Sequence, residues 1–189
     1  DFEEAYSNLG NTLRDLGRLD ELIILSKSTI DSRLVDLEYK LLAFIRLLIA
    51  HLLQNNFSET FSTINQIKEL ISKGAFEKIK NKNNKKHVIT FYRFISLLYD
   101  LLDKNDGYKN FRKIPHIGET HCLSFSHQSI YISSEIKIIQ PILITGAKAW
   151  HFAVNENNRW KDSLTQQIKN HIYSDQIFIS FGEIDCRKY

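Results

Sequence analysis

The chain has 189 residues, of which 43% are hydrophobic and 25% charged, the balance of an ordinary globular protein with room for two compact units. Its net charge of +3 is spread evenly along the sequence, which excludes the basic domain typical of a nucleic-acid-binding protein. No stretch approaches the roughly 18 uninterrupted apolar residues of a membrane span. The nearest case is Leu41–Leu53, which Arg46 and His51 interrupt, and we predict a buried helix there.

Methionine is absent, so we expect that the N-terminus was cut or processed and that the chain is an excerpt of a larger protein. A signal peptide before residue 1 stays open as an alternative. The sequence does not fix the cellular compartment. Because two cysteines do not make a disulfide scaffold, we favour the cytoplasm. The basic run Lys78–Lys86 also contains three asparagines, and we predict a solvated loop between helices.

Residues 5–22 carry the clearest helical pattern of the first half. Apolar residues recur there at helical spacing, namely Ala5, Tyr6, Leu9, Leu13 and Leu16. Gly10 leaves room for a second helix to approach, and Gly17 ends the first helix. Asp20 and Glu21 then open the next helix, where carboxylates are favourable. This spacing of an aromatic residue, Leu-Gly, a turn glycine and an acidic-apolar pair resembles the tetratricopeptide repeat.

The same pattern recurs in degraded form 38 residues later. Asn55 then corresponds to Gly17, and asparagine is the next best residue for a left-handed turn. A further apolar stripe over Val88–Leu102 predicts a capping helix. We therefore predict tetratricopeptide-like helical repeats over residues 1–104. The resemblance implies an unidentified protein or peptide partner, although packing within the core explains the same aromatic residues.

The composition changes after a polar, glycine-containing stretch that we interpret as a linker over residues 105–111. Five of the seven histidines, both tryptophans, both cysteines and both prolines follow residue 111. This concentration of chemically capable side chains indicates that function resides in the second half.

The pattern of the second half is strand, turn and helix. We predict strands over Lys113–Ile117, within Tyr131–Ile144 (ending with Pro141–Ile144) and over Ile177–Phe181. We predict a helix that follows Gly118–Cys122 and runs through Gln128, and another over Trp160–Ile172. Each strand is followed by glycine and polar residues. Such strands predict a mostly parallel sheet with helices on its faces, in which the loops after the strands gather into one crevice.

Three motifs follow these strands: Gly118-Glu-Thr-His121, a glycine at Gly146, and Gly182-Glu-Ile-Asp185. They resemble the first three conserved blocks of the SGNH (GDSL-like) hydrolases. The resemblance covers residues 112–189, and it implies the N-terminal part of a flavodoxin-like α/β/α domain. The expected fold class is thus α plus α/β: helical repeats followed by a partial α/β domain.

The resemblance implies a role for each motif residue. Thr120 takes the position of the nucleophile, with Glu119 as the acid beside it, and Gly146 takes the position of the oxyanion-hole glycine. Gly182 and Asp185 frame the third block. A hydroxyl on a tight strand-to-helix turn, near backbone N–H groups, suits such chemistry.

The chain departs from the family at four points. Thr120 replaces serine, Glu119 replaces aspartate, and Ile184 stands where the family has an asparagine that donates to the oxyanion. No Asp-x-x-His occurs before Tyr189, so the family's base lies outside the chain. These departures leave open a non-catalytic binding or scaffold protein.

Further residues near the motifs are candidates for binding substrate. His121 follows Thr120 directly, His151 follows the glycine motif, and Glu183 lies in the third block with Gly182. Arg187 is predicted to bind either Glu183 or an acidic group of the substrate. A structural role for His151 is an open alternative.

Other chemistry is open to the same residues. His121, Cys122 and Cys186, with His116 or His127, would make a zinc site, but they lack the clustered spacing typical of one. The two cysteines form either a disulfide or two buried thiols. Cys122 as a nucleophile beside His121 is a weaker hypothesis, since adjacent residues of an extended segment point apart.

The SGNH resemblance implies an esterase for acyl or acetyl esters, with a carbohydrate as the expected carrier of the ester. The repeat resemblance implies a protein-interaction segment in front of it. It needs no metal and no organic cofactor. The alternative is a binding protein that keeps the fold and the cleft without the chemistry.

Overall fold

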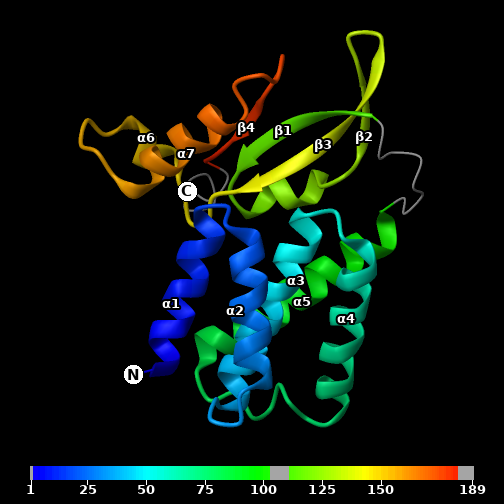
Figure 1. Ribbon diagram of the computed structural model, residues 1–189, viewed down its shortest axis with the longest axis vertical. Helices are drawn as coiled ribbons and strands as arrows, with labels where there is room; N and C mark the ends of the chain where they lie inside the picture. Colours follow the sequence, from blue (N-terminus) through cyan, green and yellow to red (C-terminus); the bar gives the residue numbers. More distant parts are fainter. Residues whose placement is uncertain (1, 103–110, 183–189) are drawn as a thin grey trace. The chain divides into compact units, whose positions relative to one another are not determined.

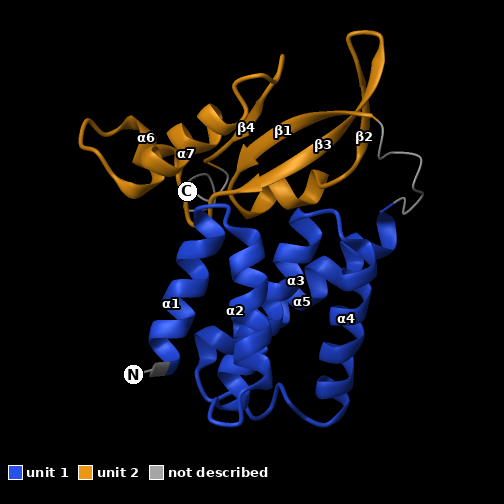
Figure 2. Cartoon of the chain, viewed as in Figure 1, with its two compact units in different colours: residues 1–102 blue, residues 103–189 orange. Residues whose placement is uncertain are grey.

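The computed structural model describes residues 2–102 and 111–182 (Figure 1). The chain divides into two compact units, residues 1–102 and 103–189 (Figure 2), and each is described by itself. Most of the predicted linker, residues 105–110, lies outside the described residues. No helix of the described residues is long and apolar enough to cross a membrane.

The first unit consists of helices. Their bounds are α1 Phe2–Asp15, α2 Leu19–Asp31, α3 Leu37–Leu53, α4 Phe57–Ser72 and α5 Lys82–Leu101. Helix α3 packs against all four others and is buried along its whole length from Leu41 to Leu53, as the sequence predicts. Its apolar residues lie all around the helix, which is the pattern of a central helix rather than a surface one.

The first two helical pairs close through the same turn. Gly17 and Asn55 both adopt positive φ, 72° and 59°. The N–H after each of them donates to the carbonyl five residues earlier, Arg18 to Leu13 and Asn56 to His51, at 2.9 Å in both cases. These bonds satisfy carbonyls that the helix end leaves open. The predicted left-handed conformation of Asn55 is confirmed.

Two predictions for the first unit are wrong in part. Only Leu13 of the apolar stripe on α1 is deeply buried, while Leu9 and Leu16 are 48% and 47% exposed, because α1 packs along a narrow stripe against α2 and α3. The basic run is a loop only in its first half. Helix α5 begins at Lys82, and the side chain of Asn81 accepts hydrogen bonds from the first N–H groups of that helix.

The second unit is built on a sheet. Its elements are β1 Arg112–Gly118, the 3₁₀ helix η2 Thr120–Phe125, β2 Ser129–Ile132, β3 Glu135–Leu143, α6 Ala149–Ala153, α7 Arg159–Asn170 and β4 Phe178–Ser180. The strand order is β2-β3-β1-β4. Strand β1 pairs in parallel with β3 and β4, and β2 pairs antiparallel with β3. The described residues thus form an α+β structure with a small mixed sheet.

The sequence interpretation differs from the second unit in two places. The run Tyr131–Ile144 contains a hairpin, whose two turn residues Ser133 and Ser134 both have positive φ. Such turns usually contain Asn-Gly, so two serines gave no signal. The helix predicted through Gln128 is the short η2, which ends at Phe125 before His127 turns with a φ of 58°.

The two faces of the parallel strands are covered differently. On one face, Ile117 and Ile144 pack with apolar residues of α6 and α7, including Phe152, Trp160 and Leu164. Side chains alternate along a strand, so His116 belongs to the opposite face, where its ring contacts Phe125 of η2. The turn that carries Thr120 therefore begins at the sheet edge and runs over the face opposite α7.

Candidate functional site

The loops after the three parallel strands meet at one edge of the sheet. Gly118 is in register with Leu143 of β3 and with Ser180 of β4. The Ile144 N–H donates to the Gly118 carbonyl at 2.8 Å, and the Glu119 N–H donates to the Ser180 carbonyl at 3.4 Å. The residues that follow each strand are thereby held side by side, as expected for the carboxyl ends of parallel strands.

Gly118 is required at the centre of this edge. A Cβ atom there would lie 2.6 Å from the Ser180 hydroxyl, 2.8 Å from the Ser180 carbonyl and 3.0 Å from the Cβ of Cys122. Since the carbonyl belongs to the backbone of β4, it cannot move aside easily. The glycine lets β1, β4 and η2 approach closely, which fixes the start of the turn that follows.

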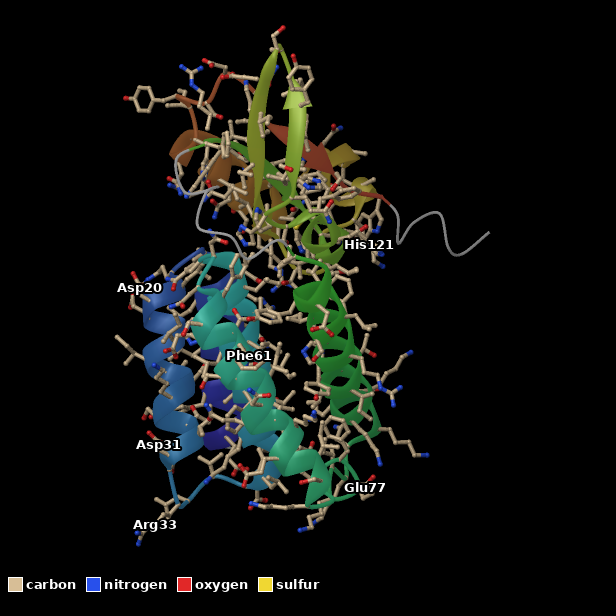
Figure 3. The ribbon with its side chains drawn as sticks, turned by 90° about the vertical axis from the view of Figure 1, so that its right-hand side faces the viewer. Asp20, Asp31, Arg33, Phe61, Glu77 and His121 are labelled. Atoms are coloured by element: carbon tan, nitrogen blue, oxygen red, sulfur yellow. The ribbon has the colours of Figure 1, made fainter. Side chains whose placement is uncertain are left out.

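Glu119 is a buried carboxylate with an accessible histidine beside it. Its side chain is 1% exposed, and within the described part of the chain its two carboxylate oxygens accept no hydrogen bond. The Nδ1 atom of His121 lies 3.5 Å from Oε1 of Glu119. The His121 side chain, which is labelled in Figure 3, is 38% exposed by its accessible area. Burying a carboxylate without hydrogen bonds costs free energy, so this position indicates a use for the charge.

Thr120 and Gly146 start the two loops beside this pair. Thr120 is the half-buried first residue of η2. Gly146 is exposed, with a φ of 71°, and an added Cβ would meet nothing within 4 Å. The preceding hydroxyl, Oγ1 of Thr145, is buried and makes no hydrogen bond within the described residues. The backbone at Gly146 is thus open on the side where a side chain would stand.

The structure adds a pair that the sequence interpretation missed. The Nε2 atom of His116 lies 2.8 Å from the Ser180 hydroxyl, across β1 and β4. The imidazole also contacts the rings of Phe125 and Phe178. Burial lowers the pKa of His116, so the ring is neutral at physiological pH. Each residue stands two positions before a motif glycine, and this shared spacing is the signal that could have found the pair.

His151 has structural contacts. It is buried, and its Nδ1 accepts the Lys148 N–H at 2.9 Å. Its ring stacks on Trp160 at a centroid distance of 3.5 Å, and its carbonyl accepts a bond from Asn158. These contacts hold the connection between α6 and α7 together. They favour the structural alternative for His151 over a place in a substrate cleft.

Cys122 is a free, buried thiol. Burial raises its pKa to about 12, so that it is protonated at neutral pH and is neither a good nucleophile nor a metal ligand. In the part of the chain that the structure describes, no three His, Cys, Asp or Glu side chains gather as metal ligands do. Cys186, the partner in the proposed disulfide, lies outside the described residues.

The third motif is described only at its first residue. Gly182 follows β4 with a φ of 106°, a conformation that favours glycine. Glu183, Asp185 and Arg187, together with Ile184, lie outside the described residues, so their predicted roles stay predictions.

Comparison of the chain with protein-family models, with curated proteins and with solved structures finds no match.

Proposed function

We propose that residues 112–189 form the N-terminal part of a flavodoxin-like domain of the SGNH type, and that the protein hydrolyses acyl or acetyl esters, with a carbohydrate as the proposed carrier. The strand order carries this proposal. In chain order the parallel strands are β1, β3 and β4, and in space they lie as second, first, third. Flavodoxin-like sheets begin in the same way and bind their ligands between the first and third strands, at the carboxyl edge. Glu119 and Thr120 follow the first of these two strands.

In this proposal the Thr120 hydroxyl gives its proton to a histidine base outside the chain, as the SGNH resemblance implies, and its oxygen attacks the ester carbonyl. The bond to the alcohol of the ester then breaks, the alcohol leaves with the proton, and the acyl group stays on Thr120. The N–H groups of Thr120 and Gly146 would stabilise the oxyanion, since Gly146 is exposed and the space above it is open. Glu119 supplies a buried negative charge next to the nucleophile. No metal and no organic cofactor takes part.

The helical unit is proposed as a tetratricopeptide-like array that binds a protein or peptide partner. The support comes from the packing of alternate helices, since α1 and α5 both pack against α3, together with the shared turn geometry of Gly17 and Asn55. Stacked helical pairs with such next-but-one contacts are the arrangement of repeat proteins, whose surfaces commonly bind other proteins.

A second candidate function is binding without catalysis. One observation favours it: within the described residues, the Thr120 hydroxyl makes no hydrogen bond to an imidazole, and an unactivated hydroxyl is a weak nucleophile. The domain would then keep the cleft and bind an ester or sugar without cleaving it.

The deciding experiment compares ester hydrolysis by the full-length protein that contains this chain with that of Thr120→Ala. The matched control is Ser124→Ala, which removes another hydroxyl from η2. Esterase catalysis predicts that Thr120→Ala loses at least about 100-fold in kcat/KM and is not labelled by a fluorophosphonate, while the control keeps both properties. Full activity in Thr120→Ala would exclude this mechanism. No activity in any variant, together with retained ligand binding, would establish the second candidate.

A further inference from the structure

A pocket lies at the edge of the sheet where β1 and β3 begin, opposite the edge of the candidate site. Its volume is about 350 Å³, at the lower end of the roughly 300–1,000 Å³ of small-molecule sites. Arg112, the first residue of β1, lines it together with Lys137 of β3 and with residues 173–176, which lead from α7 to β4. A strand rises about 3.3 Å per residue, so Arg112 lies roughly 20 Å from Gly118 at the other end of β1. The pocket is therefore separate from the candidate site.

The charged groups around this pocket balance one another. Nη1 of Arg112 lies 3.4 Å from a carboxylate oxygen of Asp175 and 3.8 Å from one of Glu135. Nζ of Lys137 lies 2.9 Å from the same Glu135 oxygen. Lys113 also lines the pocket, but side chains alternate along a strand, so its ammonium group belongs to the opposite face from Arg112. An anion would meet two carboxylates here and a cation would meet two basic groups, so the arrangement favours an uncharged ligand.

Hydrogen-bonding groups of both kinds are left for such a ligand. Oε1 of Gln176 accepts a bond from Nζ of Lys137 at 3.2 Å, and this lysine side chain is only 6% exposed. An ammonium group only donates, so the bond holds the amide oxygen toward Lys137 and leaves the amide NH₂ group for other partners. Within the described residues, neither that NH₂ group nor Oδ1 of Asp175 makes a hydrogen bond. A ligand hydroxyl both donates and accepts, and it therefore complements both groups.

Tyr173 adds an apolar surface to this polar pocket. It lines the pocket and is 97% exposed, so its ring is covered by no other part of the described chain. Tyrosine suits a binding surface because its ring is flat and apolar and loses little conformational entropy when a ligand covers it. A sugar ring has an apolar face of C–H groups and a rim of hydroxyls. The combination of Tyr173 with polar groups that carry no net charge matches both parts of such a ring.

We propose that this pocket binds a neutral pyranose sugar, whose hydroxyls bond to Asp175 and Gln176 and whose C–H face packs on Tyr173. The ion pair between Arg112 and Asp175 joins two exposed side chains, and such pairs contribute little stability, so the carboxylate is able to turn toward a ligand. The inference does not depend on Thr120 or on ester hydrolysis. In a carbohydrate esterase, such a pocket would hold the carbohydrate at a distance from the reacting ester.

The test is saturation-transfer difference NMR on the full-length protein that contains this chain. The probes are methyl glucoside, methyl galactoside and N-acetylglucosamine, none of which carries a charge. We expect at least one of them to bind, with an affinity that falls at least about 10-fold in Tyr173→Ala and in Asp175→Ala. Both side chains are exposed, so neither variant should lose its fold. The matched control is Tyr131→Ala, which removes another exposed tyrosine, from β2 outside the pocket, and should leave the affinity unchanged.

Two charged probes, inorganic phosphate and glycine, distinguish an ionic site from a sugar site. The affinity for a neutral sugar should not change when the salt concentration is raised, because no charge of the ligand is screened. Binding of phosphate through Arg112 and Lys137 would weaken under the same conditions.

The outcomes decide the proposal in both directions. Binding of a sugar that is lost in Tyr173→Ala and Asp175→Ala and kept in Tyr131→Ala supports it. The absence of a signal from all three sugars overturns it, as does sugar binding that persists in both pocket variants. Salt-sensitive binding of phosphate or glycine that depends on Asp175 or Tyr173, in place of sugar binding, overturns it as well. The measurement needs no ester hydrolysis, so failure of the Thr120 mechanism leaves this inference standing.

Discussion

The imidazole Nε2 of His116 and the hydroxyl of Ser180 lie 2.8 Å apart and join β1 to β4 through their side chains. The strands are also paired through their backbones, but only over three residues of β4. A side-chain bond next to so short a ladder gives the β4 edge of the sheet a second attachment. His116 and Ser180 each stand two residues before a motif glycine of the candidate site, Gly118 and Gly182.

Removing this bond should loosen β4. We expect Ser180→Ala to lower the free energy of unfolding by about 1 kcal/mol, because the buried His116 loses its hydrogen-bond partner. Urea unfolding followed by circular dichroism measures the change. Ser129→Ala, an exposed serine at the start of β2, is the control. A double-mutant cycle with His116→Phe should give a coupling energy between the sites; a coupling of zero would mean that the contact contributes nothing.

The turns at Gly17 and Asn55 should respond in parallel to substitution. Both residues have positive φ, which costs a residue with a Cβ atom roughly 1–2 kcal/mol. We expect Gly17→Ala and Asn55→Ala each to destabilise the protein by about 1 kcal/mol in urea unfolding, and Asn55→Gly to cause no loss. A large loss in Asn55→Gly would show that the asparagine side chain, and not its backbone conformation, is what the turn needs.

The helical unit should lose stability in mild acid through His87. Burial, helped by the positive charges of Arg14 and Arg46, lowers the pKa of His87 to about 4. The unfolded chain binds the proton near pH 6.5, so between these two values the unfolded state carries more protons and stability falls as the pH falls. For His87 alone the loss from neutral pH to about pH 5 is about 2 kcal/mol.

Urea unfolding at the two pH values checks this prediction. His87→Gln should reduce the difference in stability between them by about the same amount, whereas His171→Gln in the other unit should leave it unchanged. An undiminished pH dependence in His87→Gln would show that other groups, such as His51 with its lowered pKa, are responsible.

Cys122 should be unreactive in the folded protein. Its pKa of about 12 means that, at mildly alkaline pH, the folded thiol is ionised roughly a thousandfold less than an ordinary one. In a Cys186→Ser variant, reaction of the single remaining thiol with a disulfide reagent should be about a thousandfold slower in buffer than in denaturant. Equal rates would contradict the burial of Cys122 and reopen it as a nucleophile.

The features predicted best from the sequence are those that depend on a residue's own chemical character and not on its distant neighbours. The apolar run of α3 and the turn residue Asn55 were identified correctly, because burial on all sides and left-handed backbone each leave a direct mark on composition. The hairpin at Ser133 and Ser134 was not, since positive φ at two serines comes from the pairing of β2 with β3 and not from local preference. The exposure of Leu9 likewise depends on which helices lie nearby.

The candidate site was predictable in its location but not in its pairings. Glycines after apolar strands indicated the shared edge, and the register of β1 with β3 and β4 agrees. The bond between His116 and Ser180 joins residues 64 positions apart in the sequence, and no local pattern reveals which strand lies next to which. The burial of Glu119 beside His121 depends on η2, which begins at Thr120 and ends at Phe125, whereas the expected helix ran through Gln128.

The repeated turn at Gly17 and Asn55 makes the helical unit extensible. Residues 18–55 contain helices α2 and α3 and the turn that follows α3. The residue before this segment, Gly17, and its last residue, Asn55, both have positive φ. A duplicate of the segment inserted after Asn55 would begin and end at compatible junctions. The hydrogen bonds Arg18 N–H to Leu13 and Asn56 N–H to His51 show the geometry that each such junction would need to keep.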